Sequence, residues 1–168
     1  MSINSKFKML ALSLDGAHDD QLQKIYDLNQ ANTPEVGSLE SLDYLDKLIE
    51  LSAYNLLVLK GDEIIGFIIC MREGSAYGSE NYKFFTKKLK KFLYVDRVAI
   101  DERYRREGLA QSIYEDIFKL AQKENLPIAL EVNTQPINQP SLDFHQKMGF
   151  DQVGVKDFDD HSVAYFIK

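Results

Sequence analysis

The stretch from residue 98 to residue 110 constrains the fold of this chain more than any other part. It predicts a buried strand, then a charged turn, then a helix that opens at Leu109. A helix start exposes unpaired backbone N–H groups and carries a partial positive charge. Gly108 lets the backbone approach a ligand closely, and Arg105 and Arg106 add full positive charges. The stretch is therefore typical of a strand–turn–helix unit that cradles a phosphate group.

The bulk composition indicates one globular domain. The chain has 168 residues, 45% of them hydrophobic, and a formal net charge of −6. This length suits a single α/β domain over residues 1–168. We expect no membrane partner and a cytoplasmic location, because no signal peptide or membrane-spanning run is visible. The acidic balance argues against nucleic acid as a partner, and Cys70, inside an apolar run, is expected to be a buried reduced thiol.

Hydrophobic periodicity and turn signals predict alternating helices and strands. Ser41 and Asn138 are expected to cap helices, and Gly149 to end one. The expected elements are a strand near 10–13, helices over 19–32 and 41–49, hairpin strands 56–59 and 64–71, an amphipathic helix within 83–92, a strand over 92–100, a helix over 109–121, a strand over 127–132, a helix over 138–149 and strands over 152–156 and 162–167.

Two of these segments carry further expectations. The five lysines between residues 83 and 91 are expected to form a solvated helix face, and attraction of an anionic ligand is the less favoured alternative. Period-two counting assigns the faces of the 92–100 strand. One face is expected to hold Phe92, Tyr94, Asp96, Val98 and Ile100, and the other Leu93, Val95, Arg97 and Ala99.

The first of two separated motifs now supports a family resemblance. Arg105-x-x-Gly108-x-Ala110 directly follows the Val98-x-Ile100 strand. This pattern resembles the pyrophosphate loop of the GNAT (Gcn5-related N-acetyltransferase) superfamily, which has Gln or Arg, two residues, Gly, one residue, then Gly or Ala.

The second motif lies in the helix predicted near the C-terminus. The family often shows Asn, a small residue, an aromatic pair and Gly-Phe, and the expected order of elements also agrees over essentially the whole chain. Residues 77–82 and 92–97 are similar to a bacterial subgroup of predicted acetyltransferases. The matching residues here are Asn138, Ser141, Phe144, His145, Gly149 and Phe150.

Four positions depart from the commoner family pattern. Arg106 stands where many relatives have Gly, so we expect an ordinary backbone conformation there. Glu107 is expected to point to solvent, and Ala110 replaces the commoner Gly. His145 stands where relatives often have Tyr.

The resemblance implies an α/β fold of GNAT type. We expect a mixed, strongly twisted sheet of about six to seven strands with about four helices on both faces. The two central parallel strands, 92–100 and 127–132, would splay apart and hold acetyl-CoA (coenzyme A). The residues implicated in cofactor binding are Val98 and Ile100 on the strand, Arg105, Arg106, Gly108, Leu109 and Ala110 in the loop, and Asn138, Ser141 and Phe144 on the last helix.

The resemblance also implies N-acetyltransferase chemistry, in which a primary amine attacks the thioester directly. A lysine-like amine has a pKa of about 10.4, so some group must take its proton. Asp96 is the candidate base, and an ion pair with Arg97 or with a lysine is the equally open alternative. His145 is the candidate acid, and Tyr94 is an alternative proton donor.

The acceptor is a small-molecule or protein amine that the sequence does not identify. Tyr77 and Tyr82 are candidates to line the acceptor pocket, with buried packing as the alternative for each. Neither His18 nor His161 has metal-ligand spacing, so no metal site is expected. Many relatives form homodimers, which makes a homodimer an expectation here. A non-catalytic acyl-CoA-binding module and nucleic-acid binding through the lysines are the alternative functions.

Overall fold

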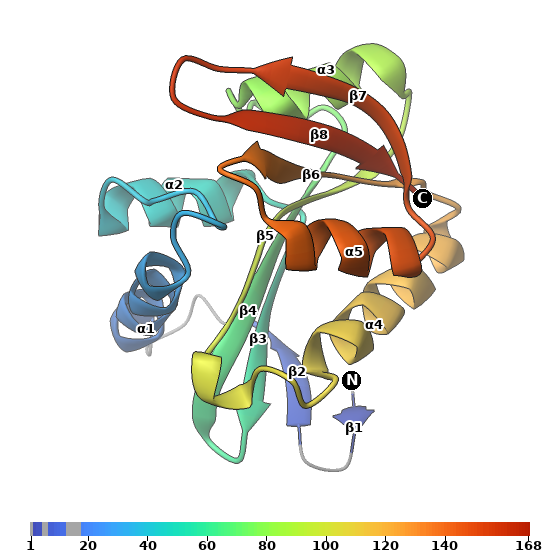
Figure 1. Cartoon of the computed structure of the whole chain (residues 1–168). Helices are drawn as coiled ribbons and strands as arrows, with labels where there is room; N and C mark the ends of the chain where they lie inside the picture. Colours follow the sequence, from blue (N-terminus) through green and yellow to red (C-terminus); the bar gives the residue numbers. More distant parts are fainter. Residues whose placement is uncertain (1, 5–6, 13–17) are drawn as a thin grey trace.

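A mixed eight-stranded sheet forms the centre of the computed structural model, which describes residues 2–4, 7–12 and 18–168. The strand order is β1-β2-β3-β4-β5-β6-β8-β7, and the parallel pair β5–β6 lies within it (Figure 1). The strands are β1 (Ser2–Asn4), β2 (Phe7–Ala11), β3 (Tyr54–Lys60), β4 (Glu63–Arg72), β5 (Leu93–Ile100), β6 (Ile128–Gln135), β7 (Asp151–Asp157) and β8 (Ser162–Ile167).

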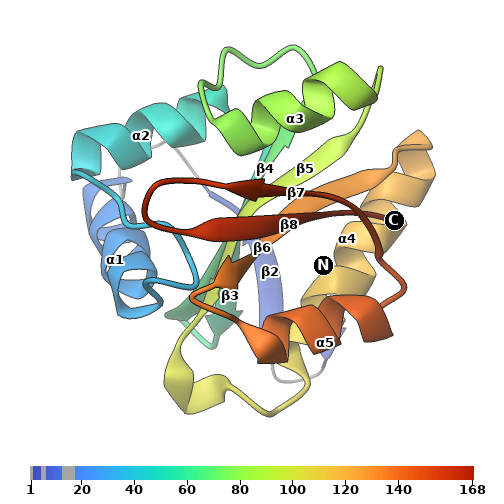
Figure 2. The ribbon, with the colours of Figure 1, turned by 45° about the horizontal axis from the view of Figure 1, so that its top comes forward.

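Five α-helices and one short 3-10 helix complete the described fold. Helices α1, α2 and α3 pack their apolar residues into one core cluster, while α4 and α5 pack against the other face of the sheet (Figure 2). The helices are α1 (His18–Ala31), α2 (Leu42–Leu51), α3 (Glu80–Lys88), η1 (Glu102–Tyr104), α4 (Leu109–Glu124) and α5 (Gln139–Lys147).

This architecture confirms the predicted fold class, with one more strand than expected. The additional strand is β1, a three-residue edge strand. The strand predicted near residues 10–13 starts earlier, at Phe7, and ends at Ala11, while Ser13 lies outside the described residues. None of the described helices is both long and apolar enough to cross a bilayer.

Local signals in the sequence located several helix ends correctly. The Ser41 side chain accepts a hydrogen bond from the backbone N–H of Tyr44 and caps α2. Asn138 caps α5 in the same way, through the N–H of Ser141. Such caps satisfy backbone donors that a helix start leaves without partners. Cys70 is buried as expected, and desolvation raises the pKa of its thiol.

The predicted assignment of the faces of β5 is wrong beyond its middle. Ile69 and Cys70 are adjacent on β4, yet they pair with Arg97 and Val95 on β5, so Asp96 is an extra residue in a β-bulge. A bulge of one residue reverses the alternation that follows it. The strand residues facing the core cluster of α4 are Leu93, Val95, Val98 and Ile100, whereas Phe92, Tyr94 and Ala99 belong to the cluster of α1, α2 and α3.

The Gly66→Ala variant tests how tightly the centre of the sheet is built. Gly66 pairs with Val58 and Ile100, and a Cβ at this position would lie 2.8 Å from the carbonyl oxygen of Ala99. Because backbone must shift to admit it, we expect the free energy of unfolding to fall by about 1–3 kcal/mol in urea denaturation. The control is Gly78→Ala, where a Cβ would meet no atom within 4 Å. Equal stability of the two variants would contradict this description of the sheet.

Candidate active site

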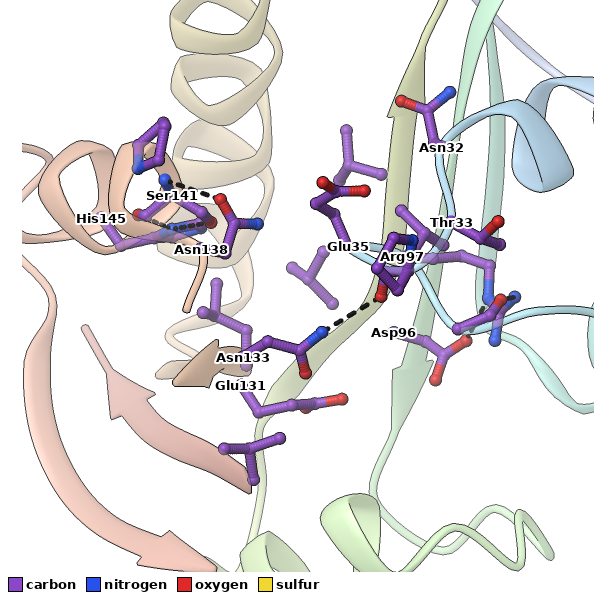
Figure 3. A pocket seen from close by; sticks show the side chains of 18 of the residues that line it. Asn32, Thr33, Glu35, Asp96, Arg97, Glu131, Asn133, Asn138, Ser141 and His145 are labelled. Atoms are coloured by element: carbon purple, nitrogen blue, oxygen red, sulfur yellow. Dashed lines mark hydrogen bonds and ion pairs between the residues drawn. The ribbon is translucent and has the colours of Figure 1, made fainter. Parts of the chain in front are cut away.

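A cleft opens where the two parallel strands separate. Strands β5 and β6 pair only at Leu93 with Ile128 and at Tyr94 with Ala129. Beyond Tyr94 the edge of β5 that faces β6 has no strand partner among the described residues. The cleft encloses about 710 Å³ and is also lined by the connection between α1 and α2 and by the starts of α4 and α5 (Figure 3).

The start of α4 borders this cleft and presents free backbone donors. Gly108 adopts a left-handed conformation (φ 73°) and precedes the helix without any side-chain cap. The first hydrogen bond within this helix start runs from the N–H of Ser112 to the carbonyl of Gly108. The N–H groups of residues 109–111 are therefore left for a ligand or for water. Ala110 lines the cleft, whereas the side chain of Leu109 is buried in the core, so Leu109 can offer a ligand only its backbone.

The charged turn before α4 has one feature that the sequence analysis got wrong. Arg106 has a φ of 67°, so the expectation of an ordinary backbone conformation is not met. Arg106 and Gly108 both have left-handed backbone conformations, and they bring the chain from η1 into α4. This conformation costs about 1 kcal/mol at Arg106, because Arg106 carries a Cβ. Arg105 lines the cleft and donates a hydrogen bond to Oδ1 of Asn32 at 2.7 Å. Glu107 is exposed, as expected.

Helix α5 contributes a second wall of the cleft, as the motif predicted. Asn138, Ser141, Phe144 and His145 all line the cavity. Figure 3 shows Asn138, Ser141 and His145 together on one side, with Asn32 and Glu35 on the opposite side. The ring of Phe144 lies 5.4 Å from that of Tyr114, centre to centre, in an edge-to-face arrangement.

The hydrogen bonds of His145 argue against its predicted role as proton donor. Its Nδ1 lies 2.7 Å from the carbonyl oxygen of Ser141, and its Nε2 lies 2.9 Å from the hydroxyl of Tyr114. A carbonyl oxygen only accepts, so Nδ1 carries the proton and Nε2 accepts from Tyr114. The side chain is buried, and desolvation lowers its pKa. The geometry favours a structural role, in which neutral His145 ties α5 to α4.

Asp96 forms the ion pair that the sequence analysis left open as an alternative. Its Oδ2 lies 2.7 Å from Nε of Arg97, and its Oδ1 accepts a hydrogen bond of 2.8 Å from the hydroxyl of Tyr77. Both carboxylate oxygens are thus engaged within the protein. Tyr77 does not itself line the cleft, but its hydroxyl contacts Asp96, which does. Tyr82 is buried, donates a hydrogen bond to the carbonyl of Arg72 and does not line the cleft.

Glu131 is the functional candidate that the sequence analysis missed. It lines the cleft from β6, and both of its oxygens lie within hydrogen-bonding distance of the Tyr94 hydroxyl, at 2.9 and 2.7 Å. Asn81 donates to the same carboxylate at 3.3 Å. Burial, and then the negative charge of Asp96, raise the pKa of Glu131 to about 8. A carboxyl group that titrates there is suited to take a proton from an amine near neutral pH.

A signal for Glu131 was present in the sequence. It is the one charged residue in the predicted strand over residues 127–132, which is otherwise apolar apart from its leading proline. An isolated carboxylate inside a buried strand marks a functional candidate, because its burial is costly. No comparable signal marks the connection between α1 and α2, which supplies the cleft residues 32–38, or Asn133, whose side chain donates to the carbonyl of Pro34 at 3.1 Å.

The described residues contain no cluster of three or more His, Cys, Asp or Glu that could hold a metal ion. The fitting ligand is instead an anionic one with an extended arm. Free N–H groups at the start of α4 and the guanidinium of Arg105 suit a diphosphate, and the unpaired edge of β5 suits an amide-containing chain.

Comparisons with known proteins agree with this geometry. Residues 22–150 match the model of the acetyltransferase (GNAT) family. An N-alpha-acetyltransferase of Saccharolobus solfataricus is 23% identical over 155 residues, which cover 92% of this chain and 89% of that protein. The crystal structure of Ard1 from Thermoplasma volcanium has a TM-score of 0.73 at 17% identity and covers 97% of both chains.

A further structure includes a coenzyme A derivative. Arabidopsis thaliana Naa50, in complex with the bisubstrate analogue CoA-Ac-MVNAL, has a TM-score of 0.70 at 18% identity, and the alignment covers 97% of this chain and 98% of that one. The match to the family model spans most of the chain and includes both motifs read from the sequence. The chain therefore belongs to the acetyltransferase (GNAT) family and is an acetyl-CoA-dependent N-acetyltransferase.

Proposed function

We propose that this enzyme acetylates the α-amino group of a peptide or protein, with Glu131 as the base that accepts the proton of the amine. The observation that carries this proposal is the carboxyl of Glu131, which lies in the cleft with a pKa of about 8. An α-amine has a pKa of about 7.7–8.0, whereas a lysine side chain has about 10.4. Proton transfer to Glu131 is therefore nearly balanced for an α-amine, whereas for lysine it is unfavourable by about two pKa units.

The relatives support the same acceptor class. The similar protein from Saccharolobus solfataricus is named an N-alpha-acetyltransferase, and the Naa50 structure holds an acetylated peptide joined to coenzyme A. Homodimer formation and the absence of nucleic-acid partners stay predictions from the sequence.

Acetyl-CoA supplies the acetyl group as an activated thioester. For its diphosphate, the N–H groups of residues 109–111 provide main-chain donors, and Arg105 provides charge. Arg106, which the motif also implicated, is exposed and is not among the residues that line the cleft. We assign its pantetheine arm to the free edge of β5, with Val98 and Ile100, and to the carboxamide of Asn138, because all three residues line the cleft.

Tyr94 and Glu131 form a hydrogen-bonded pair at the floor of the cleft. The phenol of Tyr94 is fully buried, and its pKa is raised well above the ordinary value, first by desolvation and then by the charge of Glu131. A phenol so held keeps its proton and donates it as a hydrogen bond. Tyr94 therefore orients the carboxylate of Glu131 rather than supplying a proton to the leaving thiolate, which was its alternative role from the sequence.

The acceptor would enter past two connections that line the cleft. The α1–α2 connection brings Glu35 to the cleft, and the hairpin between β7 and β8 brings Asp160 and His161. These residues offer polar groups to an incoming chain, while Asp96 and Arg97 lie deeper.

Replacement of the base gives the first test of this proposal. In Glu131→Gln the amide cannot accept the amine proton, so we expect kcat to fall by about 10²- to 10⁴-fold. In the wild type, kcat should rise through a pH near 8, where Glu131 becomes ionised, and level off above it. Thiol release from acetyl-CoA with a peptide acceptor measures both quantities. Glu50→Gln, on the exposed end of α2, is the matched control. Turnover of Glu131→Gln within twofold of wild type would remove Glu131 from the mechanism.

An acceptor panel tests the substrate class. At pH 7 we expect kcat/KM for a peptide with a free α-amine to exceed that for the same peptide with a blocked N-terminus and a free lysine by at least ~100-fold, because of the difference in amine pKa. Mass spectrometry of the products identifies the acetylated atom. A preference for the lysine peptide or for small polyamines would refute the assignment to α-amines while leaving the acetyltransferase chemistry intact.

The Gly108→Asp variant tests the diphosphate cradle. A Cβ at Gly108 would meet no atom within 4 Å, and Asp is among the residues that adopt a positive φ most readily, so the fold should tolerate the strained change. The new carboxylate repels a diphosphate. We expect the affinity for coenzyme A to fall at least ~10-fold in calorimetric titration. Gly108→Asn imposes the same strain from the positive φ without the charge, and it should bind more tightly than the Asp variant. Unchanged affinity in Gly108→Asp would place the diphosphate elsewhere.

A further inference from the structure

The β-bulge in β5 places two charged residues side by side under the α1–α2 connection. Asp96 is the extra residue of the bulge, and Arg97 follows it on the face that holds α1 and α2. The two side chains are almost fully buried, with 4% and 7% of their surfaces exposed. An ion pair at such depth loses much hydration, so it persists only with good geometry and further hydrogen bonds.

Arg97 connects β5 to α1 and to the α1–α2 connection. Its Nε bonds to Asp96 at 2.7 Å, and its Nη1 donates to Oδ1 of Asn29 at 2.9 Å and to the carbonyl of Gly37 at 3.1 Å. Asn29 also donates to that carbonyl, at 3.0 Å. The backbone of the α1–α2 connection is thus fixed to β5 by a carbonyl that accepts two hydrogen bonds.

The connection held in this way is a wall of the cleft. Residues 32–38 line the cavity without a break, and the Gly37 carbonyl lies inside this run. From the opposite side, Asn133 of β6 donates to the carbonyl of Pro34. Figure 3 shows Asp96 and Arg97 on one side of the cleft and Asn133 and Glu131 on the other, with Glu35 and Thr33 of the connection near Arg97.

The same two charges act on Glu131 through space. The negative charge of Asp96 raises the pKa of Glu131, second only to desolvation, and the positive charge of Arg97 lowers it. The other titratable or polar groups that interact with Glu131 come from every neighbouring element: Tyr94 on β5, Asn81 on α3, Tyr114 on α4 and Tyr165 on β8. Asp96 and Arg97 are the charged residues with the largest effects on this carboxyl.

We propose that Asp96 and Arg97 are positioning residues of this enzyme, which hold the acceptor wall in place through Gly37 and Asn29 and balance the charge beside Glu131. The inference rests on the proposed role of Glu131. It assigns two separable tasks to Arg97, because the fork of its guanidinium holds the wall and its charge offsets that of Asp96.

Three variants separate these tasks. Asp96→Asn removes the negative charge at nearly constant shape, and Arg97→Gln leaves Asp96 as an unpaired charge. Arg97→Lys keeps the charge but loses the fork that reaches three acceptors. Arg72→Gln, which breaks a pair with Glu73 outside the cleft, is the matched control. The readouts are the pH profile of kcat at saturating peptide, the KM for the peptide and the calorimetric affinity for coenzyme A.

Asp96→Asn and Arg97→Gln should shift the pH profile of kcat in opposite directions. Removal of the negative charge in Asp96→Asn should move the rising limb of kcat to lower pH, and Arg97→Gln should move it to higher pH, each on the order of one unit. Arg97→Lys should keep the limb near that of the wild type. Both Arg97 variants should raise the peptide KM at least ~10-fold, while the affinity for coenzyme A stays within about twofold. Arg72→Gln should change none of the three.

Two outcomes overturn the inference. Shifts of the limb in the same direction, or no shift, in Asp96→Asn and Arg97→Gln would show that the pair does not set the charge at Glu131. An unchanged peptide KM in both Arg97 variants would show that it does not hold the acceptor wall. If Arg97→Gln fails to fold, the double variant Asp96→Asn/Arg97→Gln replaces it, and its limb must fall between those of Asp96→Asn and the wild type. Retained turnover in Glu131→Gln would instead defeat the proposed function itself.

Discussion

The early separation of β5 from β6 is the constraint on which the rest of the structure depends. The strands pair at two positions and then diverge. Hydrogen bonds that a continuous sheet would use internally are therefore available to a ligand along the edge of β5. The same separation opens the floor of the cleft, so that Glu131 lies inside the sheet and still borders the cavity. A fully paired sheet would have neither the free edge on β5 nor a cleft for Glu131 to line.

The bulge at Asp96 divides β5 into two halves whose side chains alternate in opposite phase. Before it, Tyr94 points to the cluster of α1, α2 and α3 and supports Glu131. After it, Val98 and Ile100 pack toward α4, beside the helix start that suits a diphosphate. One additional residue thus allows a single strand to serve the proposed base at one end and the proposed cofactor site at the other, because the alternation of side chains reverses between them.

The elements that the sequence predicted well are those with local causes. Ser41 and Asn138 cap helices through bonds to residues three positions away, and Gly108 supplies a left-handed turn, so short windows of sequence contain the whole signal. The bulge has no such signature, since it depends on how β4 pairs with β5. The state of His145 likewise depends on Tyr114, 31 residues away, which no motif could indicate.

The charges of the site show why Asp96 attracted attention from the sequence and why Glu131 fits the chemistry better. Both are strand carboxylates that line the cleft. Asp96 has a guanidinium and a phenol as partners, which occupy both of its oxygens. Glu131 has only neutral donors in contact and a negative neighbour, so its proton is held near neutral pH. Two similar residues thus differ through their partners: the oxygens of Asp96 are engaged by Arg97 and Tyr77, whereas Glu131 is suited to exchange a proton with an amine.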